Sequence, residues 1–220
     1  MVMSSPIIDM LEEVALGLDE LKNEVVFVGG AIASLYITDE GVQRIRPTED
    51  IDCVIEVTSR RSYYQLEKKL ENLGFTHSMQ EGDPICRWNY KSYTVDVMPD
   101  DPEILGFSNK WYKNGITNAE KITLPRGTKV FIFTLPYFIA SKIEAFDNRG
   151  GGDYRMSADI EDIITVLDGQ LDFEKLLEAP DNLKDDLFIE SISCHVEPGE
   201  SNLERSKRIL DFFVGYVKTF

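Results

Sequence analysis

Two kinds of apolar pattern organise the first part of the chain. From Ile7 to Leu21 the apolar positions recur at helical spacing, so we expect the chain to open with an amphipathic helix. Residues 25–28 are all apolar and predict a short strand, which Gly29-Gly30 ends. The composition of residues 31–38 favours a helix directly after this turn. A strand, a glycine turn and a helix are therefore expected near the start.

The next predicted strand has one acidic face and one apolar face. Successive side chains of a strand point to opposite sides of the sheet, so residues two apart share a face. Asp50 and Asp52 fall on one face, about 6.6 Å apart along the strand. The opposite face is apolar and consists of Ile51, Cys53, Ile55 and Val57. Two charged carboxylates on a half-buried strand need a cation, a basic partner or open solvent.

More strands follow before the pattern becomes helical. Thr58 or Ser59 can cap a helix that runs through Leu73 and ends at Gly74. Strands are then predicted at residues 75–79, 85–90 and 93–98, with a turn at 82–84 between the first two.

Beyond residue 130 the spacing predicts helices. They cover residues 135–148, 157–167, 173–177, 181–191 and 202–216, with a glycine-rich connection at 149–153. We therefore expect an α/β (α+β) fold in two parts. Residues 1–128 form a catalytic domain with a mixed sheet and flanking helices, and residues 129–220 form a helical C-terminal domain.

A third aspartate, Asp96, stands in the apolar strand segment 93–98. Central strands tend to exclude acidic side chains unless these are paired or bind a ligand. If this strand lies beside the one that carries Asp50 and Asp52, three carboxylates converge. Such a group suits Mg²⁺, a hard cation that prefers carboxylate oxygens together with substrate phosphates.

A carboxylate trio beside a glycine turn matches the needs of phosphoryl or nucleotidyl transfer. In such reactions two metal ions about 3.5–4 Å apart hold the attacking and leaving oxygens in line and neutralise the developing charge. We expect Asp50 and Asp52 to bind both ions, and Asp96 to complete the site of the ion that activates the acceptor hydroxyl and to receive its proton. The expected contacts to a triphosphate come from the turn and the helix after it, at Gly29, Gly30 and Ser34.

Composition limits the other possibilities. The net charge of −16 disfavours non-specific binding to nucleic acid, and residues 159–205 alone carry −11. No apolar run is long enough for a bilayer and the first residues lack the pattern of a secretory signal, so we expect no membrane association and a cytoplasmic location. The widely separated Cys53, Cys86 and Cys194 argue against disulfides and structural zinc.

One stretch has the opposite charge. Residues 109–130 contain five basic residues and one acidic residue, together with Trp111 and Tyr112. They form either a small basic, aromatic surface or a loop-rich connection whose lysines only provide solubility. We favour the second interpretation, because most charge runs are simply solvated.

Several motifs together resemble the DNA polymerase β-type nucleotidyltransferase superfamily. They are the segments Val28-Gly29-Gly30-Ala31-Ile32-Ala33-Ser34, Thr48-Glu49-Asp50-Ile51-Asp52 and Val95-Asp96-Val97. Later segments are similar to motifs of the AbiEii-type nucleotidyltransferases, a group that includes toxins of bacterial toxin–antitoxin systems: Lys142-Ile143-Glu144-Ala145, Asn148-Arg149-Gly150 and residues 157–163. The resemblance covers roughly residues 25 to 168.

The resemblance also implies roles for residues of the second half. Lys142 and Arg149 share a helix face and would contact the triphosphate, and Asp159 and Asp162 match the acidic motif of the family. These aspartates would orient Lys142 or help catalysis. The subgroup often has lysine directly before the first of them, whereas this chain has Ala158. That difference implies either a substrate other than that of the subgroup or a weakened acidic motif at residues 157–163.

Each of these residues also has a purely structural interpretation. The glycine pair alone is a weak signal, and Ser34 fits helix packing as well as phosphate contact. Lys142 and Arg149 fit surface ion pairs. Asp159 and Asp162 fit acids placed at the start of a helix, where the helix dipole favours them.

The resulting hypothesis is a Mg²⁺-dependent enzyme that transfers a nucleoside monophosphate from an NTP to an acceptor hydroxyl and releases pyrophosphate. The resemblance implies an RNA acceptor, especially tRNA, in a toxin-like enzyme with an antitoxin partner. A small cationic acceptor such as an aminoglycoside suits the acidic charge better, and CCA addition to tRNA is a weaker alternative because no arginine-aspartate template motif follows. The alternative from another class is a catalytically silent nucleotide-binding regulator.

Overall fold

The structure is a computed structural model that describes residues 5–38, 46–149, 156–169 and 183. Its described residues fall into two compact units. The first unit contains residues 5–32 and 47–134, and the second contains residues 33–38, 46, 135–149 and 156–169. The division into domains 1–128 and 129–220 stays a prediction.

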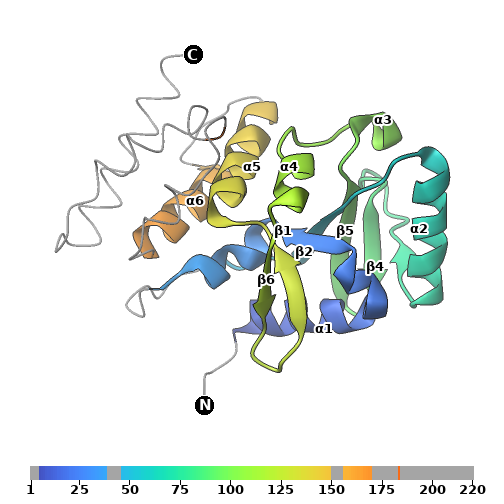
Figure 1. The fold of residues 1–220 in the computed structure, drawn as a ribbon, viewed down its shortest axis with the longest axis horizontal. Helices are drawn as coiled ribbons and strands as arrows, with labels where there is room; N and C mark the ends of the chain where they lie inside the picture. Colours follow the sequence, from blue (N-terminus) through green and yellow to red (C-terminus); the bar gives the residue numbers. More distant parts are fainter. Residues whose placement is uncertain (1–4, 39–45, 150–155, 170–182, 184–220) are drawn as a thin grey trace. The chain divides into compact units, whose positions relative to one another are not determined.

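A mixed sheet forms the centre of the first unit (Figure 1). Within the described residues it has seven strands in the order β3-β4-β5-β2-β1-β7-β6. The strands are β1 (Val25–Val28), β2 (Asp50–Ile55), β3 (Thr76–His77), β4 (Arg87–Tyr90), β5 (Tyr93–Pro99), β6 (Glu120–Thr123) and β7 (Lys129–Ile132). The central β2 runs parallel to β5 and antiparallel to β1, so Asp52 has a paired residue on both sides, whereas Asp50 is paired on the β5 side.

Strand register places the functional residues in one row. Asp52 pairs with Val28 on β1 and with Asp96 on β5, and Asp96 pairs with Arg87 on β4. Directly opposed residues of neighbouring strands project from the same face of a sheet. The predicted convergence of the two acidic strands is therefore confirmed, and the register adds an arginine to the row.

Helices complete the first unit. They are α1 (Pro6–Gly17), the 3₁₀ helix η1 (Asp19–Asn23), α2 (Arg60–Asn72), α3 (Pro102–Leu105) and α4 (Tyr112–Thr117). Ser59 caps α2 as predicted, because its hydroxyl accepts from the amide of Ser62, and Gly74 follows the helix in the left-handed conformation. On α4 the Tyr112 hydroxyl lies 3.4 Å from Met98 Sδ, on the aspartate-bearing face of β5.

The second unit contains α5 (Leu135–Asn148) and α6 (Ala158–Gly169), which pack against each other. Both helices match the predicted ranges to within two residues. The 3₁₀ helix η2 (Gly30–Tyr36) links the units, and the Tyr36 ring lies 4.9 Å from the Phe138 ring of α5. The helices predicted at 173–177, 181–191 and 202–216 lie outside the described residues, apart from Leu183.

The structure specifies two local predictions more closely. The helix expected over residues 31–38 is a 3₁₀ helix over residues 30–36. Short 3₁₀ segments are common where a chain must connect two packed elements within one or two turns. Residues 109–130 are also more ordered than a loop-rich connection, because they form α4 and the antiparallel pair of β6 and β7.

The core accounts for the cysteines and tryptophans that the structure describes. Cys53 and Cys86 are buried free thiols, in agreement with the expected absence of disulfides. Burial raises the pKa of the Cys86 thiol to about 12 and also raises the pKa of Cys53, so both stay protonated at neutral pH. Trp88 and Trp111 are buried as well. Among the described helices, none combines the length and the apolar character needed to cross a bilayer.

A buried carboxylate joins α1 to the turn between β6 and β7. Glu12 is fully buried, and its two carboxylate oxygens accept from the backbone amides of Arg126 and Thr128 at 3.2 Å each. Arg126 also pairs with Asp9 and Glu13 at 2.8 Å, at the exposed end of the same contact. The acidic residues of α1 therefore hold the hairpin against the helix.

Glu12→Ala is expected to lower the free energy of unfolding by about 2 kcal/mol, since two part-buried amides lose the buried carboxylate that accepts from them. Urea denaturation of the whole chain measures this change. Glu13→Ala is the matched control: it removes a neighbouring carboxylate whose ion pairs are exposed, so its effect should be clearly smaller. Equal effects of the two substitutions would contradict a special role for the buried carboxylate.

Candidate active site

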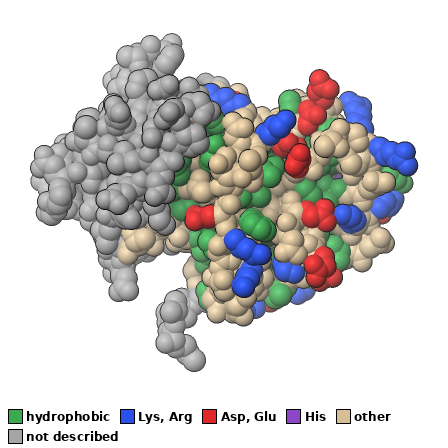
Figure 2. Space-filling view, viewed as in Figure 1, with side chains coloured by type: hydrophobic (Ala, Val, Ile, Leu, Met, Phe, Trp, Pro, Cys, Tyr) green, Lys and Arg blue, Asp and Glu red, His purple; other side chains and the backbone are tan. Residues whose placement is uncertain are grey.

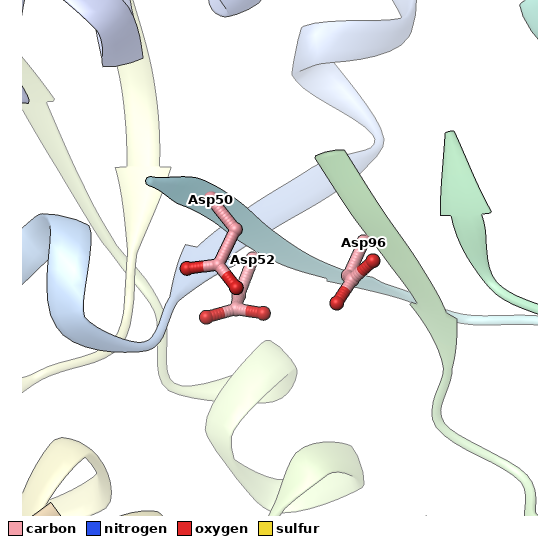
Figure 3. Close-up of side chains that lie close together, drawn as sticks. All are labelled: Asp50, Asp52 and Asp96. Atoms are coloured by element: carbon pink, nitrogen blue, oxygen red, sulfur yellow. The ribbon is translucent and has the colours of Figure 1, made fainter. Parts of the chain in front are cut away.

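Three carboxylates meet on one face of the sheet in the first unit. Figure 3 shows Asp50 and Asp52 on β2 and Asp96 on β5, with their side chains on the same side of the strands. One carboxylate oxygen of each lies within 4.8 Å of those of the other two. Asp96 is buried, whereas the Asp50 side chain is 39% exposed. The trio is therefore anchored in the sheet at one end and open to solvent at the other.

The turn after β1 is shaped to admit the Asp52 side chain. Gly29 has a φ of +71°, a conformation that glycine adopts readily and other residues rarely do. A Cβ atom at this position would lie 2.0 Å from Asp52 Oδ2. Glycine is thus required here twice, for the backbone conformation and for the space beside the carboxylate.

Two neighbouring side chains hold the trio in place. The Thr48 hydroxyl donates to Asp50 Oδ1 at 2.7 Å. Arg87 donates from Nε to Asp96 Oδ1 at 2.9 Å and from Nη2 to Asp96 Oδ2 at 2.7 Å. The same Nη2 lies 3.7 Å from Asp50 Oδ2. A two-bond guanidinium–carboxylate pair is among the stronger and more directional polar contacts in proteins.

Sequence analysis missed Arg87. From the sequence, Asp96 was interpreted as a lone acid in an apolar strand, whereas in the structure it pairs with Arg87. The hydrogen bonds to Asp96 raise the pKa of Arg87, so the guanidinium stays charged. The signal was present: a basic residue on the strand that forms a hairpin with β5 can lie opposite an acid of β5. Finding it required the exact hairpin register, because a shift of one residue would turn Arg87 to the other face.

The donor set fits a divalent cation. Mg²⁺ is bound in proteins through one or two carboxylates, with substrate phosphates and water completing its shell. The trio supplies three carboxylates on rigid strands, and the missing Cβ at position 29 leaves room beside one of them. Asp50, Asp52 and Asp96 are therefore the residues that would hold the ion.

A second charged group lies in the second unit. The buried Lys142 on α5 donates to Asp159 Oδ1 at 3.1 Å and to Asp162 Oδ2 at 2.7 Å, both on α6. Arg149 pairs with the other oxygen of Asp159. The structure thus brings together the four residues that the resemblance singled out. The contacts agree with the expectation that the two aspartates orient Lys142; their role stays a prediction.

Arg46 is a further member of this group that sequence analysis did not identify. Its Nε and Nη2 contact the two carboxylate oxygens of Asp162, each at 3.2 Å. Lys142, Arg149 and Arg46 therefore all contact the two carboxylates of this group. No local pattern identifies this partner, because it lies 116 residues from Asp162 in the sequence.

The remaining predicted phosphate contacts are less distinctive. Gly30 begins the 3₁₀ helix, and Ser34 lies within it. The Ser34 hydroxyl oxygen is buried and has no hydrogen-bond partner within the described part of the chain. Phosphate contact by either residue stays a prediction.

Two side chains of the basic stretch 109–130 are engaged within the protein. On the face that Figure 2 shows, basic and acidic side chains of the described residues are interspersed. Trp111 is buried beneath Lys110, whose ammonium lies 5.0 Å from the ring centroid, so the indole is not an open platform for a base. Arg126 is already paired with carboxylates of α1. The solvated interpretation of this stretch remains the preferred one.

Comparison with known proteins identifies the fold. The chain is similar to the crystal structure of an antigenic nucleotidyltransferase-like protein from Paracoccidioides brasiliensis, with 24% sequence identity and a TM-score of 0.50. That match covers 83% of this chain and 85% of the other. The solution structure of the antibiotic-resistance factor ANT(2'')-Ia also matches, with 16% identity, a TM-score of 0.48 and coverage of 85% and 94%. Neither a protein-family model nor a curated protein sequence matches.

The similarity to the nucleotidyltransferase-like protein, together with the mixed sheet and flanking helices, confirms the predicted fold class. The chain has a nucleotidyltransferase-like fold. Membership of the AbiEii-type subgroup stays a prediction, as do the functional roles of the individual site residues.

Gly29→Ala should push the Asp52 carboxylate out of the trio and weaken binding of a divalent cation by at least about tenfold, because the added methyl group overlaps Asp52 Oδ2. Titration with Mn²⁺, followed by electron paramagnetic resonance of the free ion, measures this loss. Gly74→Ala is the matched control, since Gly74 also has a positive φ but a Cβ there would meet nothing within 4 Å. Equal loss of Mn²⁺ binding in both variants would refute the steric explanation.

Lys142→Met is expected to lower the free energy of unfolding by about 3 kcal/mol, since it removes the buried cation between two buried carboxylates. Chemical denaturation tests this, with the exposed Lys113→Met as a control that should change little. An unchanged free energy of unfolding in Lys142→Met would show that the two arginines alone compensate the aspartates.

Proposed function

We propose that this protein is a Mg²⁺-dependent nucleotidyltransferase that moves a nucleoside monophosphate from an NTP to an acceptor hydroxyl. The observation that supports this most directly is the trio of Asp50, Asp52 and Asp96 on two parallel strands beside a glycine turn. The nucleotidyltransferase-like fold agrees with the proposal without establishing the activity.

The proposed reaction is a substitution at the α-phosphorus of the NTP. The acceptor oxygen forms a bond to that phosphorus, the bond from the phosphorus to the oxygen that bridges to the β-phosphate breaks, and pyrophosphate leaves. Asp96 receives the proton of the acceptor hydroxyl. Asp50 and Asp52 would hold both cations, Asp96 would complete the site of one of them, and the amides of the Gly29-Gly30 turn would face the phosphates.

The cations, expected to be two Mg²⁺ ions, would supply charge neutralisation at the phosphate and activation of the acceptor hydroxyl. The chain itself contributes rigid placement, since all three carboxylates project from paired strands. Rigid placement of the groups that bind reactants is a large part of catalysis in phosphoryl transfer. In the second unit, Lys142 and Arg149 are the proposed contacts to the triphosphate, with Asp159 and Asp162 as the residues that orient them.

The acceptor is proposed to be a small cationic hydroxyl compound rather than tRNA. The net charge of −16 favours a cationic substrate and opposes a polyanion. The local support for RNA is weak, because Trp111 is buried and Arg126 is engaged by α1. A toxin-like enzyme that modifies tRNA and is held by an antitoxin, as the AbiEii-type resemblance implies, is the second candidate.

The experiment is transfer of label from an α-³²P-labelled NTP in Mg²⁺ to an aminoglycoside panel and, separately, to total tRNA. Label on the small compound supports the first acceptor, and label on RNA supports the second. Nucleotide binding without transfer to either would favour the silent regulatory protein.

Asp52→Asn should reduce label transfer by about three orders of magnitude or more, because it removes a carboxylate that both cations need. The variant is isosteric, so circular dichroism should show an intact fold. Asp101→Asn, at the start of α3, is the control for loss of one aspartate and should retain activity. Full activity of Asp52→Asn would eliminate the proposed mechanism.

A further inference from the structure

The two-bond contact of Arg87 uses both oxygens of a carboxylate that the proposed cation also needs. Asp96 Oδ1 and Oδ2 each accept from this guanidinium, at 2.9 and 2.7 Å. The Asp96 side chain is only 10% exposed, so water has little access to satisfy it instead. Each oxygen keeps a second lone pair, so a cation that binds Asp96 shares this carboxylate with the guanidinium and weakens its hydrogen bonds.

The guanidinium also reaches the second aspartate of the trio. Arg87 Nη2 lies 3.7 Å from Asp50 Oδ2, so one positive group lies between strands β2 and β5 on their acidic face. Charges of the same sign in one site repel each other, and the effect is larger where solvent is partly excluded. Arg87 and a divalent ion thus compete for the same carboxylates.

A nearby carboxylate offers Arg87 another partner. Asp83 Oδ1 lies 3.4 Å from Arg87 Nη1, on the opposite branch of the guanidinium from the Nη2 that contacts Asp50. Asp83 lies directly after Gly82, which has a φ of +94°, and its other oxygen is hydrogen-bonded to the Ser78 hydroxyl. A guanidinium that leaves Asp96 therefore keeps a carboxylate partner four residues away on the same segment.

We propose that Arg87 is a positioning residue that sets the affinity of the carboxylate trio for divalent cations. It holds Asp96 in place through two hydrogen bonds, and it yields this carboxylate to the ion by shifting its contact to Asp83. The inference rests on the proposed function, since it takes the trio to be a metal site. Its consequence is that the trio binds a cation more weakly than three such carboxylates would without the arginine.

The test is Mn²⁺ binding to the whole chain in the absence of nucleotide, measured by calorimetry and by electron paramagnetic resonance of the free ion. Arg87→Met should bind Mn²⁺ about tenfold more tightly than the wild type, the factor expected when a partly buried ion pair no longer has to be broken. Arg87→Lys should fall between the two, because it keeps the charge but loses the paired geometry. The control is Arg61→Met, which removes an exposed arginine of α2 and should leave the affinity unchanged.

Asp83→Asn should have the opposite effect. Without the second carboxylate, Arg87 is committed to Asp96, so Mn²⁺ should bind several-fold more weakly than to the wild type. In an Arg87→Met background the same substitution should have no effect. This reversal separates competition by Arg87 from general loosening of the site, which would weaken binding in both single variants.

Thermal denaturation gives a second readout that does not depend on activity. Arg87→Met removes the cation that contacts Asp96 and Asp50, so Mn²⁺ should raise its melting temperature more than it raises that of the wild type. Unchanged or weaker Mn²⁺ binding by Arg87→Met overturns the inference, provided that the wild type binds and Asp52→Asn does not. Absence of saturable binding in all forms overturns the metal site itself, and the inference with it.

Discussion

Repulsion between carboxylates is the constraint on which the first unit depends. Three acidic side chains with oxygens within 4.8 Å of one another repel each other, and a nearby positive charge offsets that repulsion. Arg87 provides such a charge through its contacts to Asp96 and Asp50. The sheet keeps the groups together, since each carboxylate is fixed by the pairing of its strand rather than by a loop.

In the second unit, protein cations pair with two buried carboxylates. Asp159 and Asp162 each contact Lys142 and an arginine. The cation of Lys142 is itself buried and contacts both carboxylates. The trio of the first unit differs in being partly open to solvent, since the Asp50 side chain is 39% exposed.

Prediction from sequence succeeded where the evidence was local or periodic. Three examples are the strand at residues 25–28, the Ser59 cap and the range of α5. They were predicted from the spacing of apolar residues, from capping chemistry and from glycine positions, all of which act over a few residues. The convergence of Asp50, Asp52 and Asp96 was predicted on the condition that β2 and β5 are neighbours, which the structure confirms. The helix predicted directly after the glycine turn is also present, as a 3₁₀ helix over residues 30–36.

The sequence alone identified the candidate site residues, because a carboxylate spacing of two on a strand and a glycine pair before a helix are properties of the chain itself. Only the tertiary structure decided how their charges are balanced. Local patterns did not identify Arg87 or Arg46. Arg87 lies opposite Asp96 because of the hairpin register. Arg46 contacts Asp162 because segments more than a hundred residues apart meet in the fold. Charges compensate one another according to their distance in space, and the order of residues along the chain does not give that distance.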